Sequence, residues 1–188
     1  GVLEKLTQTG ANVIPIMSEM SYNTDTRFGK AEDFRTNITN LTGNNIICCV
    51  KDAEPIGPKN LLDLLVVLPC TGNTLAKIAN GIADTSVTMA VKAHLRNQKP
   101  VLLAVSTNDG LGTAAKNIGT LLNCKNLYFL PFSQDDYIKK PNALVAVFEK
   151  LSDAAIAAAE GRQLQTVLGF SYWLHMTKNT DFCLKSVF

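Results

Sequence analysis

Two short runs of consecutive apolar residues, 64–68 and 101–105, constrain the fold of this chain more than any other feature of its sequence. Neither run alternates apolar with polar residues, as a strand with one solvent-facing side would. Such strands are typical of a parallel sheet whose two faces are both covered by helices. Three further runs rich in β-branched or aromatic residues are also predicted strands: residues 11–17, 45–50 and 127–130.

Segments with helical periodicity separate these strands, which is the pattern of βαβ units. The predicted helices span residues 2–8, 31–41, 74–82, 87–97, 114–122 and 142–159. The predicted fold class is therefore α/β: a three-layer α/β/α sandwich around a mostly parallel, doubly wound sheet of the Rossmann-like or flavodoxin-like kind. The 188 residues, 46% hydrophobic and 18% charged, suit one such domain with a well-filled core.

Charge and hydropathy exclude several classes of protein. A formal net charge of +2 offers no electrostatic footprint for nucleic acid. No run approaches the roughly 18 apolar residues of a membrane helix, and no signal-peptide pattern is seen, so a cytoplasmic protein is expected. The five cysteines are odd in number and form no C-x-x-C pair, so no metal site is predicted.

Small hydroxyl and amide residues follow three of the predicted strands. In parallel sheets of this kind, ligands bind at the carboxyl ends of the strands, where these residues would converge. Such residues are also ordinary in turns and helix caps, so no single loop is diagnostic. The candidate binding residues are Ser18, Thr71, Gly72, Asn73, Thr74, Ser106, Thr107 and Asn108.

The loop 69–74 carries the most chemistry, because it leads from a buried strand into a helix. Its glycine lets the backbone approach a ligand, and the free N–H groups of the helix start suit a phosphate. The first turn holds no carboxylate, which fits an anion there. Alternatively, Asn73 or Thr74 caps the helix. The loop is neither a Walker A motif nor G-x-G-x-x-G.

Residues 69–84, PCTGNTLAKIANGIAD, resemble the P-A-S-A-N-T-x-x-K-x-A-x-G-x-x-D motif of the flavoprotein superfamily, which includes FMN-dependent cysteine decarboxylases and flavin prenyltransferases. The resemblance covers about residues 1–165. It implies an FMN-binding fold, with the phosphate near Asn73 and Thr74. Ser18 and the loop 106–108 would reach the ring system, and Thr71 and Gly72 replace the motif's Ser and Ala.

Two departures from the decarboxylases stand out. Residues 106–108 keep only the asparagine of their P-x-M-N motif, and residues 21–28 lack the histidine that those enzymes use. His94, in a predicted helix, and His175, near the C-terminus, do not replace it. Oxidative decarboxylation of a cysteine group is therefore disfavoured, and no catalytic residue is assigned.

Four further segments narrow the resemblance to one subunit of an oxidoreductase from the mother cell of sporulating bacteria: residues 23–29, 53–59, 104–112 and 132–143. Such a subunit would take part in oxidising a dihydro precursor to a pyridine dicarboxylate. A separate subunit would bind the nicotinamide cofactor, NADP, and this chain would also form a homo-oligomer. Two alternatives stay open: a non-catalytic scaffolding subunit, and an independent FMN-dependent decarboxylase or prenyltransferase.

A dicarboxylate substrate would call for cations, and a guanidinium suits bidentate capture of a carboxylate. Arg27, in the loop region near Ser18, is the first candidate, ahead of Lys51 and Lys59. The alternative for each is an ordinary solvated surface charge.

Both ends of the chain depart from the superfamily pattern. Residues 1–165 form the predicted flavoprotein-like domain, and its first strand, with a T-G-S phosphate loop, is missing. The chain is therefore expected to be incomplete, or impaired in stability and flavin binding. Residues 166–188 form an atypical C-terminal tail.

Overall fold

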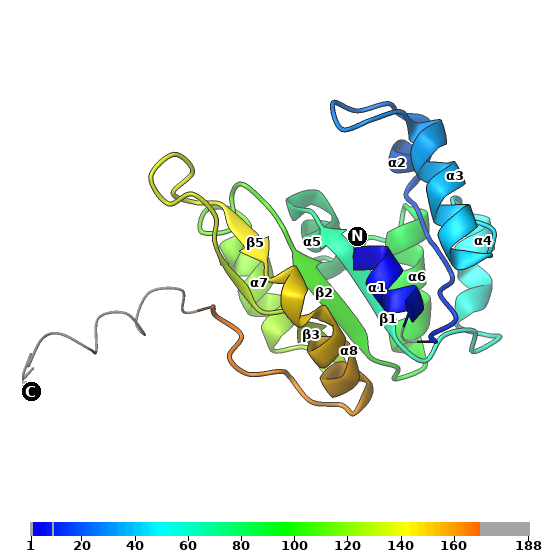
Figure 1. Ribbon diagram of the computed structural model, residues 1–188. Helices are drawn as coiled ribbons and strands as arrows, with labels where there is room; N and C mark the ends of the chain where they lie inside the picture. Colours follow the sequence, from blue (N-terminus) through cyan, green and yellow to red (C-terminus); the bar gives the residue numbers. More distant parts are fainter. Residues whose placement is uncertain (1, 9, 170–188) are drawn as a thin grey trace, which may run out of the picture.

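The computed structural model describes residues 2–8 and 10–169, and its centre is a parallel sheet of three strands (Figure 1). β1 (Leu65–Cys70), β2 (Val101–Val105) and β3 (Leu127–Phe129) lie side by side in that order. Every residue of β2 is fully buried, because β2 has a strand on each side and helices over both faces. The two apolar runs that dominate the sequence thus form strands of a parallel sheet, as predicted, and these strands are neighbours.

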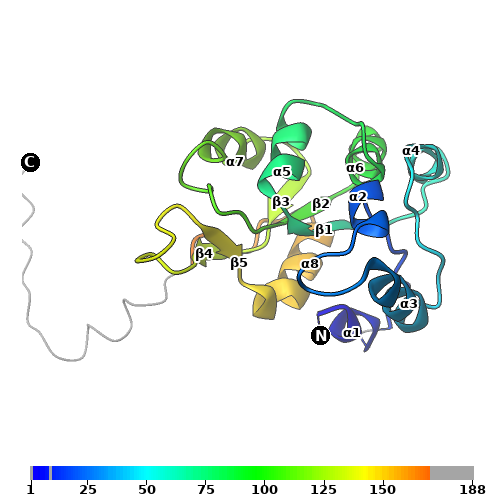
Figure 2. The same cartoon turned by 90° about the horizontal axis from the view of Figure 1, so that it is seen from above.

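Helices cover both faces of this sheet (Figure 2). α5 (Gly72–Ala79), α6 (Ser86–Arg96) and α7 (Ala115–Leu122) pack on one face, where Leu65 and Val67 of β1 point. α8 (Leu151–Ala159) and α1 (Val2–Gln8) lie on the other face, where Val66 and Leu68 point. Successive β1 side chains thus enter two separate cores, and the predicted α/β/α sandwich is confirmed.

The remaining elements flank the sheet. α2 (Glu19–Asn23), α3 (Ala31–Thr42), α4 (Val50–Ala53) and the 3₁₀ helix η1 (Glu54–Ile56) lie on the β1 side. Beyond β3 the chain forms an antiparallel hairpin of β4 (Phe132–Gln134) and β5 (Leu144–Ala146), followed by η2 (Phe148–Lys150). Thr107 and Leu144 form an antiparallel bridge that fixes this hairpin to the end of β2.

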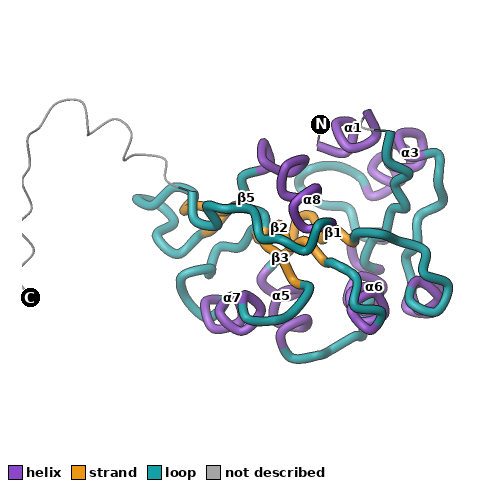
Figure 3. Tube along the Cα trace, turned by 90° about the horizontal axis from the view of Figure 1, so that it is seen from below, coloured by secondary structure: helices purple, strands orange, loops and turns teal. Residues whose placement is uncertain are grey.

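The expectation of strands at residues 11–17 and 45–50 is wrong. Both segments are loops beside the sheet (Figure 3), joined by a single parallel bridge between Ile16 and Ile47. Proline has no N–H, so Pro15 cannot donate to a ladder and only its carbonyl is used, accepting from Ile47 N at 2.9 Å. The second segment turns into α4 at Val50 before further pairing can form. β1 pairs only with β2 within the described residues.

The helix expected over residues 142–159 is also only partly correct. Its first part forms β5, which pairs with β4, and then η2; the α-helix begins at Leu151. The segment 144–147 alternates buried and half-buried side chains, the period of a strand, whereas the later alanine-rich part favours helix.

The chain passes beyond residue 165 along the hairpin. Phe132 N donates to Val167 O at 3.0 Å, and Gly169 N donates to Phe132 O at 2.8 Å. The rest of the predicted tail, residues 170–188, lies outside the described residues. Among the helices that the structure describes, none is long and apolar enough to cross a membrane.

Candidate functional site

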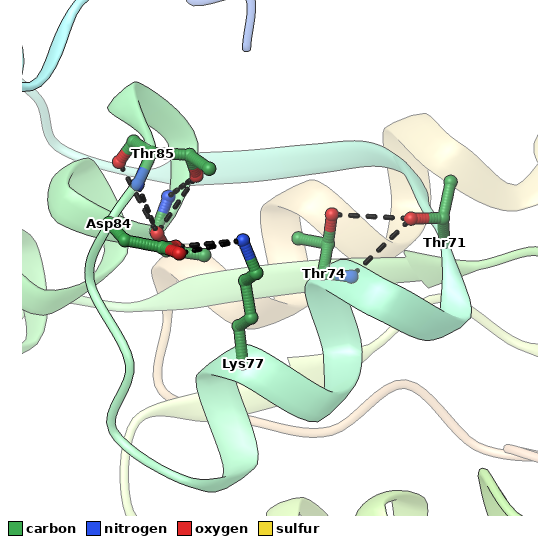
Figure 4. Close-up of polar contacts among 6 residues, drawn as sticks. Thr71, Thr74, Lys77, Asp84 and Thr85 are labelled. Atoms are coloured by element: carbon green, nitrogen blue, oxygen red, sulfur yellow. Dashed lines mark hydrogen bonds and ion pairs between the residues drawn. The ribbon is translucent and has the colours of Figure 1, made fainter. Parts of the chain in front are cut away.

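The turn from β1 into α5 is ordered by one threonine (Figure 4). Thr71 is the N-cap of α5: its Oγ1 accepts from Thr74 N at 3.4 Å and lies 3.2 Å from Thr74 Oγ1. The suggested caps Asn73 and Thr74 are therefore wrong. Because these two residues lie inside the first turn, the exposed Asn73 side chain is left without a partner in the described structure. The amide groups of Gly72 and Asn73 precede the first intrahelical hydrogen bond.

The loop after β2 lies directly against this turn. A Cβ placed on Gly72 would come within 2.7 Å of Thr107 Oγ1 and 3.1 Å of Asp109 Oδ1. Thr107 is held in place because its hydroxyl donates to Asp109 Oδ1 at 2.6 Å. The structure thus brings together the two candidate loops, 71–74 and 106–108. Asp109, whose carboxylate orders the second loop, is a site residue that sequence reasoning missed, although it follows Asn108 directly.

Ser106 and Asn108 differ in their surroundings. The backbone of Ser106 continues the β1–β2 pairing, with Ser106 N donating to Cys70 O at 3.0 Å, but its hydroxyl oxygen is buried without a hydrogen-bond partner. Asn108 is exposed. Buried polar groups without a hydrogen-bond partner are rare in folded proteins. The Ser106 hydroxyl is therefore a candidate for contact with a bound ligand.

Ser18 lies at the start of α2, and its loop is attached to α6. It is the N-cap of α2, accepting from Ser21 N at 3.2 Å. The preceding carbonyl, that of Met17, accepts from the buried Ser86 Oγ at 2.6 Å, which fastens this loop to the start of α6. No hydrogen bond between described residues joins Ser18 directly to either of the other two loops. Ser86 has a positioning role that the sequence did not reveal.

An ion pair holds α5 against the start of α6 (Figure 4). Lys77 Nζ lies 2.8 Å from Asp84 Oδ1 and 2.9 Å from Oδ2. These are the Lys and Asp of the motif, but the sequence analysis did not predict this contact. The Lys77 hydrogen bond lowers the pKa of Asp84 below its ordinary value. Next to Asp84, Thr85 and Thr88 form a reciprocal capping box that starts α6.

Two ionisable side chains that the sequence brought into question, Cys70 and His94, are both buried. Burial raises the pKa of the Cys70 thiol to about 12, so this thiol is protonated at neutral pH. His94 is 2% exposed near the other end of α6, where its Nε2 hydrogen-bonds Pro100 O at 3.1 Å. Burial lowers the pKa of His94. His94 is thus a structural residue, buried more deeply than its helix pattern suggested.

The three cationic side chains proposed to bind the substrate have no contact with these loops in the described part of the chain. Arg27 stacks over the ring of its neighbour Phe28 at 4.8 Å in an exposed turn. Lys51, in α4, and Lys59, after η1, are also exposed. No contact recorded between described residues brings any of the three to the loops 71–74 or 106–108.

The two loops have the features that an FMN phosphate requires. Two amide N–H groups are free at the start of α5, and Asn73 is available to donate. The first turn itself holds no carboxylate; the Asp109 carboxylate of the neighbouring loop lies against Gly72 and already accepts the Thr107 hydroxyl. The buried, unpartnered hydroxyl of Ser106 is in the neighbouring loop, where the Ser106 N–H donates to Cys70 O. The residues present therefore fit such a group.

Comparisons with known proteins show the family of the chain. The profile of the family described as Flavoprotein matches residues 1–158. The chain is 42% identical over 170 residues to the B subunit of dipicolinate synthase from Bacillus subtilis (strain 168), a match that covers 90% of this chain and 85% of that protein.

Solved structures show the same relationship. The B subunit of dipicolinate synthase from Bacillus halodurans C superposes with a TM-score of 0.82 at 43% identity, covering 89% of this chain and 86% of that one. AnUbiX in complex with FMN and dimethylallyl pyrophosphate gives a TM-score of 0.54 at 20% identity, over 83% of this chain and 79% of that one, which shows a shared fold alone. The chain belongs to the Flavoprotein family.

Proposed function

We propose that this chain is the B-type subunit of a dipicolinate synthase. In this role it binds FMN and takes part in oxidising a dihydrodipicolinate-type precursor to pyridine-2,6-dicarboxylate during sporulation. The observation that carries the proposal is the 42% identity to a protein of that name across 85% of its length. FMN would supply a hydride acceptor, which is what aromatisation of a dihydropyridine needs.

The chain's own residues have distinct parts in this proposal. Gly72, Asn73 and Thr74 hold the phosphate through the start of α5, and Thr71 keeps that turn in shape. Ser106, Thr107 and Asn108 contact the flavin from the β2 loop. Ser18 approaches from the start of α2.

Flavin retention tests the phosphate site. The purified protein is expected to show flavin absorbance, and Asn73→Leu is expected to abolish it while leaving the circular dichroism spectrum unchanged. Asn37→Leu is the matched control, because Asn37 is also exposed on a helix but lies on α3. Flavin bound equally by wild type and Asn73→Leu would contradict this placement.

A second candidate, a scaffolding role, is favoured by one observation. Among residues 70–74 and 106–109 the ionisable groups are Cys70, protonated at neutral pH, and Asp109, bonded to Thr107. Asp109 is the one carboxylate among these residues, and it already accepts the Thr107 hydroxyl. In a scaffolding role the proton acceptor for the reaction would be a group of the partner instead of Asp109. Measuring dipicolinate formation with this chain alone, with the partner subunit alone and with both together separates the two roles. A scaffolding subunit would give no product by itself.

The proposed partner, oligomeric state and location of the protein follow from its assignment as a B-type subunit. The partner is the A-type subunit of dipicolinate synthase, which binds NADP, and the assembly works in the cytoplasm of the mother cell with this chain as a homo-oligomer. Sedimentation of the chain alone and mixed with that partner tests the assembly. A lone monomer in both samples would contradict it.

A further inference from the structure

An open cavity of about 480 Å³ lies between α2, α3 and residues 45–46, and no residue of the loops 71–74 and 106–108 lines it. One cationic side chain, Arg35, lines it, and no carboxylate does. The other lining residues offer mainly hydroxyl and amide groups: Tyr22, Thr36, Thr39, Asn40, Asn45 and Ile46. This composition suits an anion with several acceptor atoms.

The guanidinium in this cavity is held in a fixed position. Arg35 Nη1 donates to Tyr22 O, and the guanidinium carbon lies 4.7 Å from the centre of the Tyr22 ring. Stacking of this kind orients the flat group in advance, so little further ordering is needed when a ligand binds. Most of its five N–H donors stay available.

Arg35 also lacks a counter-ion. Within the described part of the chain it forms no ion pair, and the side chains of Thr36, Thr39, Asn40 and Asn45 have no hydrogen-bond partner. An orientated guanidinium surrounded by unpartnered neutral donors is expected to select a carboxylate.

The cavity is one helical turn from a residue of the proposed flavin site. Tyr22 N donates to Ser18 O at 2.9 Å, and Ser18 caps the helix on which Tyr22 lies. Tyr22 thus connects the cavity, through one turn of α2, to Ser18 of the proposed flavin site. Arg27, by contrast, stacks on an exposed ring outside this cavity.

We propose that the cavity between α2 and α3 binds a small dicarboxylate, with Arg35 holding one carboxylate group. Thr39 and the amides of Asn40 and Asn45 complete the contact. The identity of the ligand rests on the proposed function, since that function supplies a dicarboxylate substrate and product. Arg35 thus replaces Arg27 as the substrate-binding arginine.

Calorimetric titration of the full-length chain with pyridine-2,6-dicarboxylate tests this proposal. Arg35→Leu is expected to weaken binding at least tenfold, because a charge-assisted bidentate contact is lost. Arg35→Lys should keep part of the affinity, and Arg27→Leu, the matched control, all of it. Thr39→Val, a substitution of similar shape, should weaken binding several-fold without affecting the Arg35–Tyr22 contact.

Three outcomes would overturn the inference: no binding by wild type, equal binding by wild type and Arg35→Leu, or tighter binding of inorganic phosphate than of the dicarboxylate. The proposed function fails separately, if the protein retains no flavin. Dicarboxylate binding by Asn73→Leu after flavin loss would support the cavity assignment alone.

Discussion

Gly72 is the point at which the two loops of the proposed flavin site meet. A Cβ at this position would lie 2.7 Å from Thr107 Oγ1, closer than Cβ atoms approach other atoms in real proteins. We expect Gly72→Ala to destabilise the protein, because overpacking of about 1–3 kcal/mol exceeds the roughly 1 kcal/mol that alanine gains over glycine in a helix. Urea unfolding measures the difference.

Gly119 provides the matched control for this substitution. It lies in α7, and its Cβ would meet nothing within 4 Å, so Gly119→Ala should be neutral or stabilising by up to about 1 kcal/mol. Adding Thr107→Ala to Gly72→Ala should recover part of the lost stability. Equal effects of the two glycine substitutions would refute the close approach of the loops.

His94 makes stability depend on pH in the neutral range. Its pKa is lowered by burial below the ordinary 6.5, so the unfolded chain binds the proton more readily. The protein should therefore lose stability as the pH falls below about 6.5, toward the folded pKa. His94→Gln, which keeps a donor for Pro100 O, should lose less between pH 7 and pH 5 in thermal unfolding. Parallel losses in both proteins would show that His94 is not responsible.

The residue types at the strand ends were predictable, but their hydrogen bonds were not. Hydroxyl and amide residues after β1 and β2 indicated a binding edge. Which of Thr71, Asn73 or Thr74 caps α5 depends on where the extended backbone ends, and Thr71 has the last extended backbone conformation. The burial of His94 depends on the return of the chain at Pro100, which helical periodicity does not show.

At the scale of elements, Lys77 and Asp84 fasten the end of α5 to the start of α6. We expect Lys77→Met to raise the pKa of Asp84 toward its ordinary 3.8, because the hydrogen bond that stabilises the carboxylate is removed. An NMR titration of the Asp84 carboxyl measures this shift. The stabilising contribution is present above pH 3.8 and is lost as the pH falls through the lower folded pKa.

Lys77→Arg is the control, because it keeps a cation within reach of Asp84. Amide exchange of residues 80–86 should speed up in Lys77→Met and stay near wild type in Lys77→Arg. An unchanged pKa of Asp84 in Lys77→Met would mean that the pair does not persist in solution.

Helices and strands were predicted best where the hydrophobic pattern of the sequence matches the burial that the fold provides. Residues 101–105 are apolar throughout and form the central strand. The run 11–17 had β-branched residues, but the Pro15 ring removes a donor and one bridge to Ile47 is all that forms. Periodicity alone could not show that residues 144–146 would pair with β4 instead of joining α8, because that pairing depends on how the loop 135–143 returns the chain to the preceding strand.

At the scale of the whole molecule, the proposed flavin site depends on segments that are far apart in the chain. Ser86 joins the Met17–Ser18 loop to α6 by a hydrogen bond, and Lys77 joins α5 to the start of α6 by an ion pair. Gly72 lies against the loop that follows β2. A ligand that contacts all three loops would bind only the folded chain. Its binding free energy then adds to global stability by linkage.

FMN should therefore raise the unfolding temperature of the whole molecule. At a free concentration of 100 times its Kd the expected gain is about 2.7 kcal/mol, which for a domain of this size corresponds to roughly 5–11 °C. Riboflavin, which lacks the phosphate, should give a smaller shift, because the free amides of Gly72 and Asn73 then have no anion to bind. Differential scanning fluorimetry of wild type and Asn73→Leu, each with both ligands, measures these shifts. Equal shifts with FMN and riboflavin in wild type would place the phosphate outside the start of α5, even if flavin binds.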